Sequence, residues 1–299
     1  MDKNNSTIKF REIDYSKDIS EINELFSIGL GSHHNKKTFV WKHIENPFGR
    51  SFGLLACDAD KIVGVRMFMK WELTGEGKTI KAIRPVDTLT HPEYRGRGIF
   101  KELTLCGLEK YKTHYDLVFN TPNANSLPGN LKMGWSICTQ KLDYKMALVT
   151  PYFGKTNFNL IKIDDFVQLE KNDVNNTVIT TFPSESFIKW RYKDDLYEIA
   201  KIIVEERIIY IIYKTQNHRG IKFNLIEKII GDSLYFKQAL KILAAKTHIF
   251  FIYYLENKFT KFRFLLSSKR NEAVIVYNKD RYRVNDKICF TLGDLEASL

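Results

Sequence analysis

The sequence has little cysteine and shows no metal-binding pattern. Its four cysteines lie far apart, without a CxxC pair or a neighbouring histidine: Cys57, Cys106, Cys138 and Cys289. The seven histidines form no HxxxH or mixed His/Cys cluster. A zinc site or a disulfide framework needs such residues at short, regular spacings. We therefore expect free, partly buried thiols and no bound metal.

Long apolar runs are also missing. The sequence contains no stretch of about 18 apolar residues, the length that a membrane-spanning helix requires. Its start, MDKNNSTIKF, has no apolar signal-peptide core. From these absences we expect neither export of the protein nor a membrane-spanning segment. A reducing, cytoplasmic location fits the free thiols best.

Basic residues outnumber acidic ones, but they are not gathered in one place. The chain has 46 Lys and Arg against 35 Asp and Glu, a formal net charge of +11 and a pI near 9.3. Such a charge suits nucleic acid, an anionic membrane or phosphate-bearing ligands. Lysines occur throughout both halves and form no basic arm, which is typical of a solvated surface. We expect neither nucleic acid nor a membrane as partner; nucleic-acid binding would predict a steeply salt-dependent affinity.

The sequence contains enough apolar side chain for two hydrophobic cores. It is 299 residues long, 44% hydrophobic, 13% aromatic and 27% charged, which is the composition of a folded protein. Because this length exceeds one ordinary small domain, we predict two domains, residues 1–150 and 151–299. The boundary is expected within residues 141–185, where Pro, Gly and Asn recur.

Periodicity in the first half predicts alternating strands and helices. Apolar residues recur at helical spacing within residues 19–30 and 99–108. Strand-like runs are residues 8–10, 51–57, 61–71, 79–90, 116–120 and 136–149, and a break-rich segment ends at Gly134-Trp135. The predicted order is β, α, β, β, β, α, β, α, β.

A basic glycine turn, Arg95-Gly96-Arg97-Gly98, joins the strand-like run 79–90 to the helix-like run 99–108. Two glycines free the backbone to present several N–H groups in one direction. The helix that follows adds the positive end of its dipole. This turn indicates an anion site, and it suits a pyrophosphate better than a single carboxylate.

One acidic residue stands among apolar residues just before this turn. In the 79–90 strand, Ile83, Asp87 and Leu89 share a face. Apolar surroundings would raise the pKa of the Asp87 carboxyl toward a value useful for a general base. In the alternative interpretation, Asp87 is a local partner for Arg84 or makes a hydrogen bond near the turn.

These features resemble the GNAT superfamily of acyl-CoA N-acyltransferases over about the first 150 residues. The family pattern Gln/Arg-x-x-Gly-x-Gly/Ala is met by Arg95-Gly96-Arg97-Gly98-Ile99, after Thr90-His91-Pro92-Glu93-Tyr94, and departs at Phe100, where a small residue is usual. Asn123, Asn130 and Gly134-Trp135 match the family's Asn…Tyr…Gly-Phe stretch. The resemblance implies an α+β fold: a mixed, mainly antiparallel sheet with flanking helices.

The resemblance also implies acetyl-CoA as the acyl donor, without a metal. The backbone amides of the turn would hold the CoA pyrophosphate: Arg95, Gly96, Arg97, Gly98, Ile99 and Phe100. The backbones of Thr88, Leu89 and Thr90 would hydrogen-bond the pantetheine arm where two strands splay apart. Asn123 would reach the far side of the cofactor.

The activity implied is transfer of an acetyl group to a primary amine of a small acceptor. A carboxylate would take the amine proton directly or through water; Asp87 is the first candidate and Glu72 the second. His91 ranks lower, because it lies nearer the phosphate turn. Asn130 stands where the family often has an acidic tyrosine, and an amide cannot donate a transferable proton.

The sequence also indicates a class of acceptor and an alternative function. An amino sugar, including a nucleotide-linked one, fits the basic surface and the aromatic segment Trp41–Phe48, which either lines a pocket or caps a core. The missing acid at Asn130 motivates the alternative, a non-catalytic CoA-binding sensor or scaffold with a GNAT fold.

The second half echoes the first. Phe187-Ile-Lys-Trp190-Arg-Tyr192 resembles Phe39-Val-Trp41-Lys-His43, and each precedes two strand-like runs, here residues 197–205 and 207–214. A strand at 221–230, a helix at 233–246 and a strand at 249–255 continue the parallel.

At the turn, however, the second half reads Ile229-Ile230-Gly231-Asp232-Ser233. An aspartate at this position would repel a pyrophosphate. We therefore predict a degenerate GNAT-like domain that has lost CoA binding and supplies a wall of the acceptor pocket. In the alternative, residues 151–299 form an unrelated α+β domain and the echo is chance.

Overall fold

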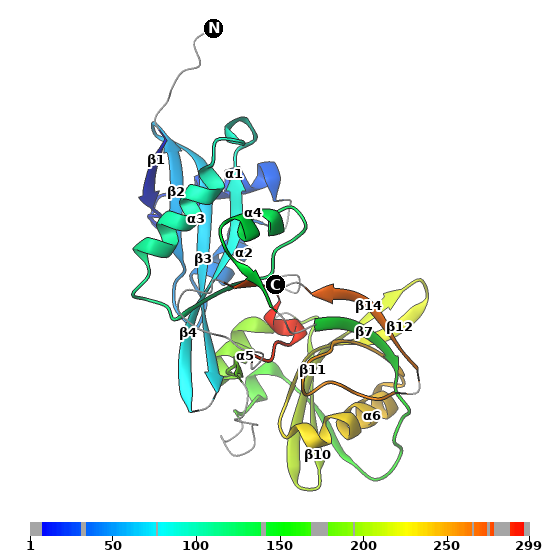
Figure 1. The fold of residues 1–299 in the computed structure, drawn as a ribbon. Helices are drawn as coiled ribbons and strands as arrows, with labels where there is room; N and C mark the ends of the chain where they lie inside the picture. The colour runs from blue at the N-terminus through cyan, green and yellow to red at the C-terminus, as the bar shows by residue number, and fades with distance from the viewer. Residues whose placement is uncertain are drawn as a thin grey trace. The chain divides into compact units, whose positions relative to one another are not determined.

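The structure, a computed structural model, describes residues 8–30, 34–75, 77–138, 142–168, 179–193, 195–264, 266–273, 276–277 and 288–295. The chain divides into two compact units (Figure 1). The first comprises Met1–Glu72, Ile80–Ile137 and Ile275–Arg283, and the second comprises Leu73–Thr79, Cys138–Val274 and Val284–Leu299.

The sheet of the first unit is mixed and mainly sequential. Its strands are β1 (Lys9–Glu12), β2 (Phe52–Asp58), β3 (Lys61–Gly75), β4 (Lys78–Thr90), β5 (Leu117–Asn120), β6 (Ser136–Ile137) and β15 (Val276–Tyr277), in the order β1-β2-β3-β4-β5-β15-β6. β1 to β3 pair antiparallel, whereas β4 and β5 are parallel. The end of β3 also pairs with β9 (Thr180–Thr181).

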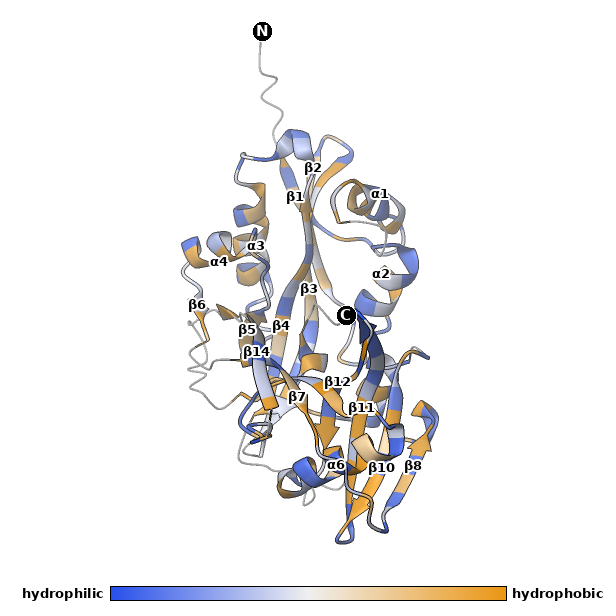
Figure 2. Ribbon diagram, turned by 90° about the vertical axis from the view of Figure 1, so that its right-hand side faces the viewer, coloured by the Kyte–Doolittle hydropathy of each residue, from blue (hydrophilic) through white to orange (hydrophobic). Residues whose placement is uncertain are grey.

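Helices cover both faces of this sheet. They are α1 (Ile19–Gly29), α2 (Lys36–His43), α3 (Ile99–Lys110) and α4 (Leu127–Lys132). A 3₁₀ turn, η1 (Pro92–Tyr94), links β4 to the glycine turn. In Figure 2, α1 and α2 lie on one side of β2 to β4, and α3 and α4 lie on the other. The sheet is therefore enclosed between two helical layers.

Strand β3 is buried on both of its faces. The face that includes Val63 and Trp71 is buried, and Arg66 and Phe68 on the opposite face are buried as well. The Arg66 guanidinium lies over the Phe100 ring at 5.0 Å. A strand covered by helices on both sides needs no solvent face, so its polar residues must find partners inside.

Helix α2 was not predicted from the sequence, and its composition shows why. It begins after Asn35, whose side chain accepts a hydrogen bond from the Thr38 amide at 3.1 Å. Its buried side chains are Phe39, Lys42 and His43. Two of these three are polar, so the helix has almost no apolar periodicity to detect.

The second unit contains another sheet. Its strands are β7 (Leu142–Leu148), β8 (Asn157–Ile161), β10 (Glu198–Val204), β11 (Arg207–His218), β12 (Ile221–Ile230), β13 (Phe251–Leu255) and β14 (Leu266–Ala273), in the order β14-β7-β13-β12-β11-β10-β8. β12 and β13 are parallel, and the other neighbouring pairs are antiparallel. The helices are α5 (Glu185–Arg191) and α6 (Phe236–Thr247), with 3₁₀ turns η2 (Ile163–Asp165), η4 (Ser233–Tyr235) and η5 (Leu292–Asp294).

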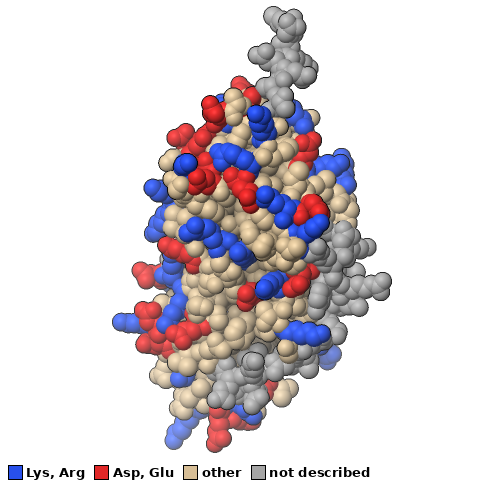
Figure 3. Space-filling model, turned by 90° about the vertical axis from the view of Figure 1, so that its left-hand side faces the viewer, with Lys and Arg blue, Asp and Glu red and all other residues tan. Residues whose placement is uncertain are grey.

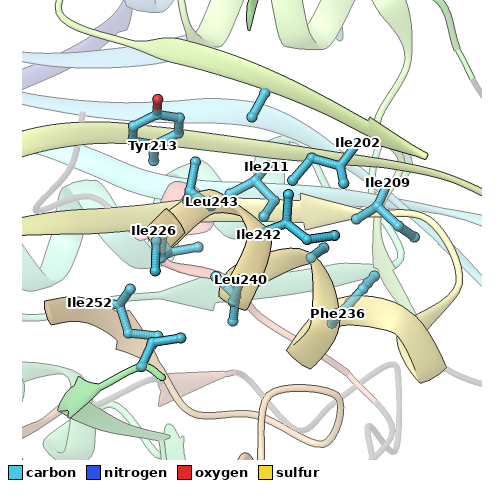
Figure 4. Close-up of a cluster of buried hydrophobic side chains, with 14 of the residues drawn as sticks. Ile202, Ile209, Ile211, Tyr213, Ile226, Phe236, Leu240, Ile242, Leu243 and Ile252 are labelled. Carbon is cyan, nitrogen blue, oxygen red and sulfur yellow. The ribbon is translucent and has the colours of Figure 1, made fainter. Parts of the chain in front are cut away.

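One face of this second sheet packs against α6. Phe236, Leu240 and Leu243 of the helix meet a row of strand residues that includes Ile202, Ile211, Tyr213, Ile226 and Ile252 (Figure 4). Each such side chain contributes about 1.5–3 kcal/mol when it leaves water. This cluster is the core of the second unit.

The predicted fold class is confirmed, since both units combine mainly antiparallel sheets with helices. Strand β7 pairs with β13 and β14 of the second sheet, so the compact units part at residue 138, and the domain division at residue 150 stays a prediction. Part of the predicted boundary, residues 169–178, lies outside the described residues. No helix among the described residues is long and apolar enough to cross a membrane.

Candidate active site

The glycine turn lies between η1 and α3 in the first unit. Gly96 and Gly98 have φ angles of +78° and +80°, in the left-handed region that side chains rarely adopt. A Cβ at Gly96 would meet nothing within 4 Å, so the glycine serves the backbone conformation there and not a tight contact. Gly98 is the N-cap residue of α3.

The amides of this turn have the donor capacity that an anion requires. The Arg95 N–H donates to the Pro92 carbonyl at 3.2 Å. Among the backbone hydrogen bonds of the described chain that lie outside helices and strands, none is donated by the N–H groups of residues 96–100. The first amides of a helix also have no partner inside the helix. This turn at the positive end of α3 therefore fits a phosphate-bearing ligand.

The arginine side chains of the turn are tied to nearby backbone. The Arg95 Nε donates to the Thr90 carbonyl at 3.3 Å, and Arg97 donates to the Glu93 carbonyl at 3.2 Å. The Arg97 guanidinium also lies 4.7 Å from the centre of the Tyr94 ring. These bonds keep two positive charges beside the turn.

Strand β4 leaves its ladder with β5 before it reaches the turn. The parallel pairs are Ala82↔Leu117 and Ile83↔Val118, and none of residues 88–90 pairs with β5 in the described chain. Thr88 receives a hydrogen bond on its hydroxyl from Arg66. The separation of the two strands supports the predicted splay beside Thr88–Thr90.

Asp87 has an unusual backbone and a crowded carboxylate. Its φ angle is +43°, and the residue is only 7% exposed. Lys42 Nζ lies 3.0 Å from Oδ1, and His43 Nε2 lies 2.8 Å from Oδ2. A second imidazole, His34 Nε2, lies 3.5 Å from Oδ1. On its other side, the His43 Nδ1 is 2.9 Å from Ser51 Oγ.

These neighbours determine the charges of the cluster. Burial would raise the pKa of Asp87, but the Lys42 charge and the hydrogen bonds of His34 and His43 hold it well below the usual value. Burial lowers the pKa of His43. A neutral His43 then donates a hydrogen bond from Nε2 to the ionised Asp87 and accepts one from the Ser51 hydroxyl at Nδ1. The expectation that apolar strand neighbours raise the pKa of Asp87 was wrong, because its polar partners come from α2 and from His34, which precedes that helix.

The alternative partner of Asp87 lies elsewhere. The Arg84 guanidinium stands over the rings of Trp71 and Phe119, at 4.7 and 5.0 Å from their centres. Glu72, the second base candidate, is half-buried near the end of β3. His91 caps η1 by accepting the Glu93 amide at 3.4 Å.

The two asparagines of the family stretch have different surroundings. Asn123 is exposed, and its Oδ1 accepts the amides of Asn125 and Ser126, each at 3.0 Å, ahead of α4. Asn130 on α4 is fully buried, and neither of its side-chain polar atoms has a hydrogen-bond partner among the described residues.

Three residues of the cluster, His34, Lys42 and His43, were missed by sequence reasoning. Each is far from Asp87 in the chain, and Lys42 and His43 lie on the helix whose polar composition hid it. One available signal was a basic pair directly after Trp41, in a segment that is echoed by Trp190-Arg191.

The corresponding turn of the second unit is closed by its own aspartate. Asp232 Oδ1 accepts the Leu234 amide at 3.0 Å, and the Asp232 carbonyl accepts the Tyr235 amide at 3.1 Å. Gly231 has a φ of +132°, and a Cβ there would lie 2.7 Å from the Ile208 carbonyl oxygen. This turn borders a cavity of about 70 Å³ that is also lined by Lys228, Asn257 and Cys289.

Residues 9–138 match the family described as the acetyltransferase (GNAT) domain. This part of the chain is a GNAT domain. The match supports an acyl-CoA-dependent N-acyltransferase, and GNAT domains generally use acetyl-CoA. No group of His, Cys, Asp and Glu side chains in the described residues could hold a metal ion.

Solved structures share the fold over both units. A GCN5-related N-acetyltransferase from Anabaena variabilis ATCC 29413 is 12% identical over 90% of this chain and 72% of its own, with a TM-score of 0.67. One from Kribbella flavida is 13% identical over 91% and 71%, with a TM-score of 0.65. The glucosamine N-acetyltransferase region of a fungal multi-domain GH3 beta-N-acetylglucosaminidase is 12% identical over 91% and 38%, with a TM-score of 0.57. No curated protein matches the sequence significantly.

Proposed function

We propose that this GNAT domain transfers an acetyl group from acetyl-CoA to a primary amine of a small acceptor. The observation that carries the proposal is the glycine turn at the start of α3, directly after a strand that has left its parallel neighbour. The amides of residues 95–100 would hold the pyrophosphate. The backbones of Thr88, Leu89 and Thr90 would hold the pantetheine arm, and the Asn123 side chain would contribute its amide nitrogen.

Acetyl transfer forms a nitrogen–carbon bond and breaks the carbon–sulfur bond of the thioester. The chain must orient the amine, accept its proton and polarise the carbonyl with a strand N–H. Asp87 is the first candidate for the proton acceptor. Because its carboxylate is buried and both oxygens are engaged by Lys42 and His43, it would act through a water molecule. Glu72 is the second candidate.

The proton for the CoA thiolate must come from another source than the usual tyrosine. Asn130 occupies the matching position and can hydrogen-bond but cannot release a proton. Water or another side chain would supply it.

The acceptor that fits best is an amino sugar, including a nucleotide-linked one. The net charge of +11 favours a phosphate-bearing acceptor. A protein of similar fold is described as a glucosamine N-acetyltransferase region, which makes glucosamine the first compound to assay. On the face shown in Figure 3, basic and acidic side chains are interspersed, as expected for a small-molecule enzyme without a nucleic-acid stripe.

We further propose that the second unit is a degenerate GNAT-like domain without CoA binding. Its turn has one glycine, and the Asp232 carboxylate already accepts the turn amide that an anion would use. A negative charge there also opposes a pyrophosphate.

The stability of the protein, measured at increasing acetyl-CoA concentration, tests the donor site. Binding should raise the free energy of unfolding by about 2.7 kcal/mol at a ligand concentration one hundred times Kd. Gly98→Trp should abolish that gain. Gly220→Trp is the matched control, since Gly220 also has a positive φ of +83° and open space around it. Unchanged thermal stability of the wild type at saturating acetyl-CoA would refute the proposal.

The second candidate function is a non-catalytic CoA sensor, favoured by Asn130. Steady-state release of free thiol over an amine panel separates the two functions. Tight acetyl-CoA binding without turnover on glucosamine or any other amine would favour the sensor.

A further inference from the structure

Asp87 is a point of unusual backbone conformation within β4. A φ of +43° is rare for an aspartate and persists only where the surroundings hold it. Thr88, Leu89 and Thr90 follow directly, and they are the residues whose backbones the proposed function assigns to the pantetheine arm. Whatever holds Asp87 therefore sets the direction of those backbone groups.

The Asp87 side chain is held mainly from α2. Lys42 binds one carboxylate oxygen at 3.0 Å and His43 binds the other at 2.8 Å. All three side chains are almost completely buried. Ser51, which precedes β2, fixes the far side of the His43 ring at 2.9 Å. Since both oxygens are bound in different directions, the carboxylate cannot rotate without breaking a buried polar contact.

The second unit repeats the pairing of an acid with the Trp-containing helix. The β11–β12 register passes from Tyr213↔Ile226 to Ile212↔Lys228, so Glu227 is the extra residue of a bulge. Glu227 is fully buried. Arg191, which follows Trp190 on α5 as Lys42 follows Trp41 on α2, acts electrostatically on Glu227 together with Lys214.

This repeat separates a structural role from a functional one. In the second unit, the acid is the extra residue of a bulge, and the strand leads to a turn that Asp232 has closed. In the first unit, the acid and its basic partners precede an open glycine turn. If the pairing affects ligand binding, it must do so in the first unit only.

We propose that Lys42 and His43 are positioning residues for acyl transfer, holding Asp87 so that the backbone of Thr88–Thr90 is directed at the pantetheine arm. This rests on the proposed function. It implies that loss of Lys42 weakens binding of the pantetheine part of the donor and leaves binding of its diphosphate part unchanged.

Titration calorimetry with two probes, acetyl-CoA and ADP, tests this implication. ADP carries a diphosphate for the glycine turn and has no pantetheine. In Lys42→Met, the Kd of acetyl-CoA should rise about 10-fold, the loss of roughly one to two hydrogen bonds, while the Kd of ADP stays within about 2-fold. Lys42→Arg should bind acetyl-CoA about as well as the wild type, because, unlike Lys42→Met, it keeps a cation at the carboxylate. His43→Gln should weaken acetyl-CoA binding in the same direction.

A second variant and a matched control keep the test decisive. Lys42→Met with Asp87→Asn removes both charges and leaves no uncompensated carboxylate to unfold the protein, but it should still bind acetyl-CoA weakly. Arg191→Met removes the corresponding cation of the second unit, and it should leave both affinities unchanged.

Three results would overturn the inference. These are unchanged acetyl-CoA affinity in Lys42→Met, equal weakening of ADP and acetyl-CoA, and the same weakening in Arg191→Met. A wild-type protein that binds ADP but not acetyl-CoA would instead contradict the proposed function, and the inference with it.

Discussion

Each unit has a buried acidic residue in the strand that leads to its turn, Asp87 in β4 and Glu227 in β12, but the charge states of the two residues differ. Asp87 has a lysine at 3.0 Å and an imidazole at 2.8 Å, and its pKa is held well below the usual value. Burial raises the pKa of Glu227, whose ion pair with Lys214 is longer, at 3.4 Å. A buried carboxylate with close partners stays ionised, and one without them tends toward neutrality. The first unit therefore keeps an ionised carboxylate, paired with Lys42, in the strand that leads to its glycine turn.

The turns of the two units also differ, in whether their backbone amides have partners within the chain. The first has two glycines at positive φ and amides that donate to no backbone carbonyl in the described loops, whereas the second gives a turn amide to Asp232. The first arrangement offers donors to a ligand, and the second satisfies them within the chain. Together, these differences favour the proposal that the ligand site lies in the first unit.

The largest expected effect is on stability in Lys42→Met. It leaves the Asp87 carboxylate buried without its cation, so the free energy of unfolding should fall by about 3–5 kcal/mol. Arg191→Met should cost less, because Lys214 remains near Glu227. Urea denaturation at pH 7 measures both variants. Equal losses would mean that the two acids are held alike, and the comparison would fail.

The next effect concerns pH. The folded-state pKa of Asp87 is depressed, so its contribution to stability is present above its unfolded pKa and is lost as pH falls through the folded value. Lys42→Met should raise that folded value, so acid unfolding should begin at a higher pH than in the wild type. Circular dichroism during acid titration from pH 7 downward checks this. Superimposable acid limbs for the two proteins would count against the Lys42 pairing.

Glu227 should behave in the opposite way. Its folded-state pKa is raised, so its contribution to stability is present below the unfolded pKa and is lost as pH rises through the folded value. Glu227→Gln should therefore stabilise the protein at pH 7–8, by about 1 kcal/mol, and have little effect near pH 4. Thermal melts at both pH values make the measurement. A stability loss at pH 8 would show that Arg191 and Lys214 need the charge.

The contrast between the units was only partly predictable from the sequence. The glycine turn and helices α1 and α3 carry local signals, namely paired glycines and apolar residues at helical spacing. The pairing of Lys42 with Asp87 spans 45 residues and joins a helix that has no apolar stripe. Strand β7 likewise belongs to the second sheet because it pairs with β13 and β14, which lie far along the chain. Local patterns predict elements, but only tertiary packing determines which charges meet.

The smallest expected effect tests whether Asp232 merely caps its turn. Asp232→Ala removes the acceptor of the Leu234 amide and should lower the free energy of unfolding by about 1 kcal/mol, the usual scale of a capping residue. Asp232→Asn, which keeps an acceptor oxygen without the charge, should lose less. The informative step is to titrate acetyl-CoA into Asp232→Ala that also carries Gly98→Trp. If the capping aspartate alone prevented binding in the second unit, acetyl-CoA would bind this double variant. We expect no binding, because the second turn has one glycine where the first has two, and Gly231 is already packed against the Ile208 carbonyl.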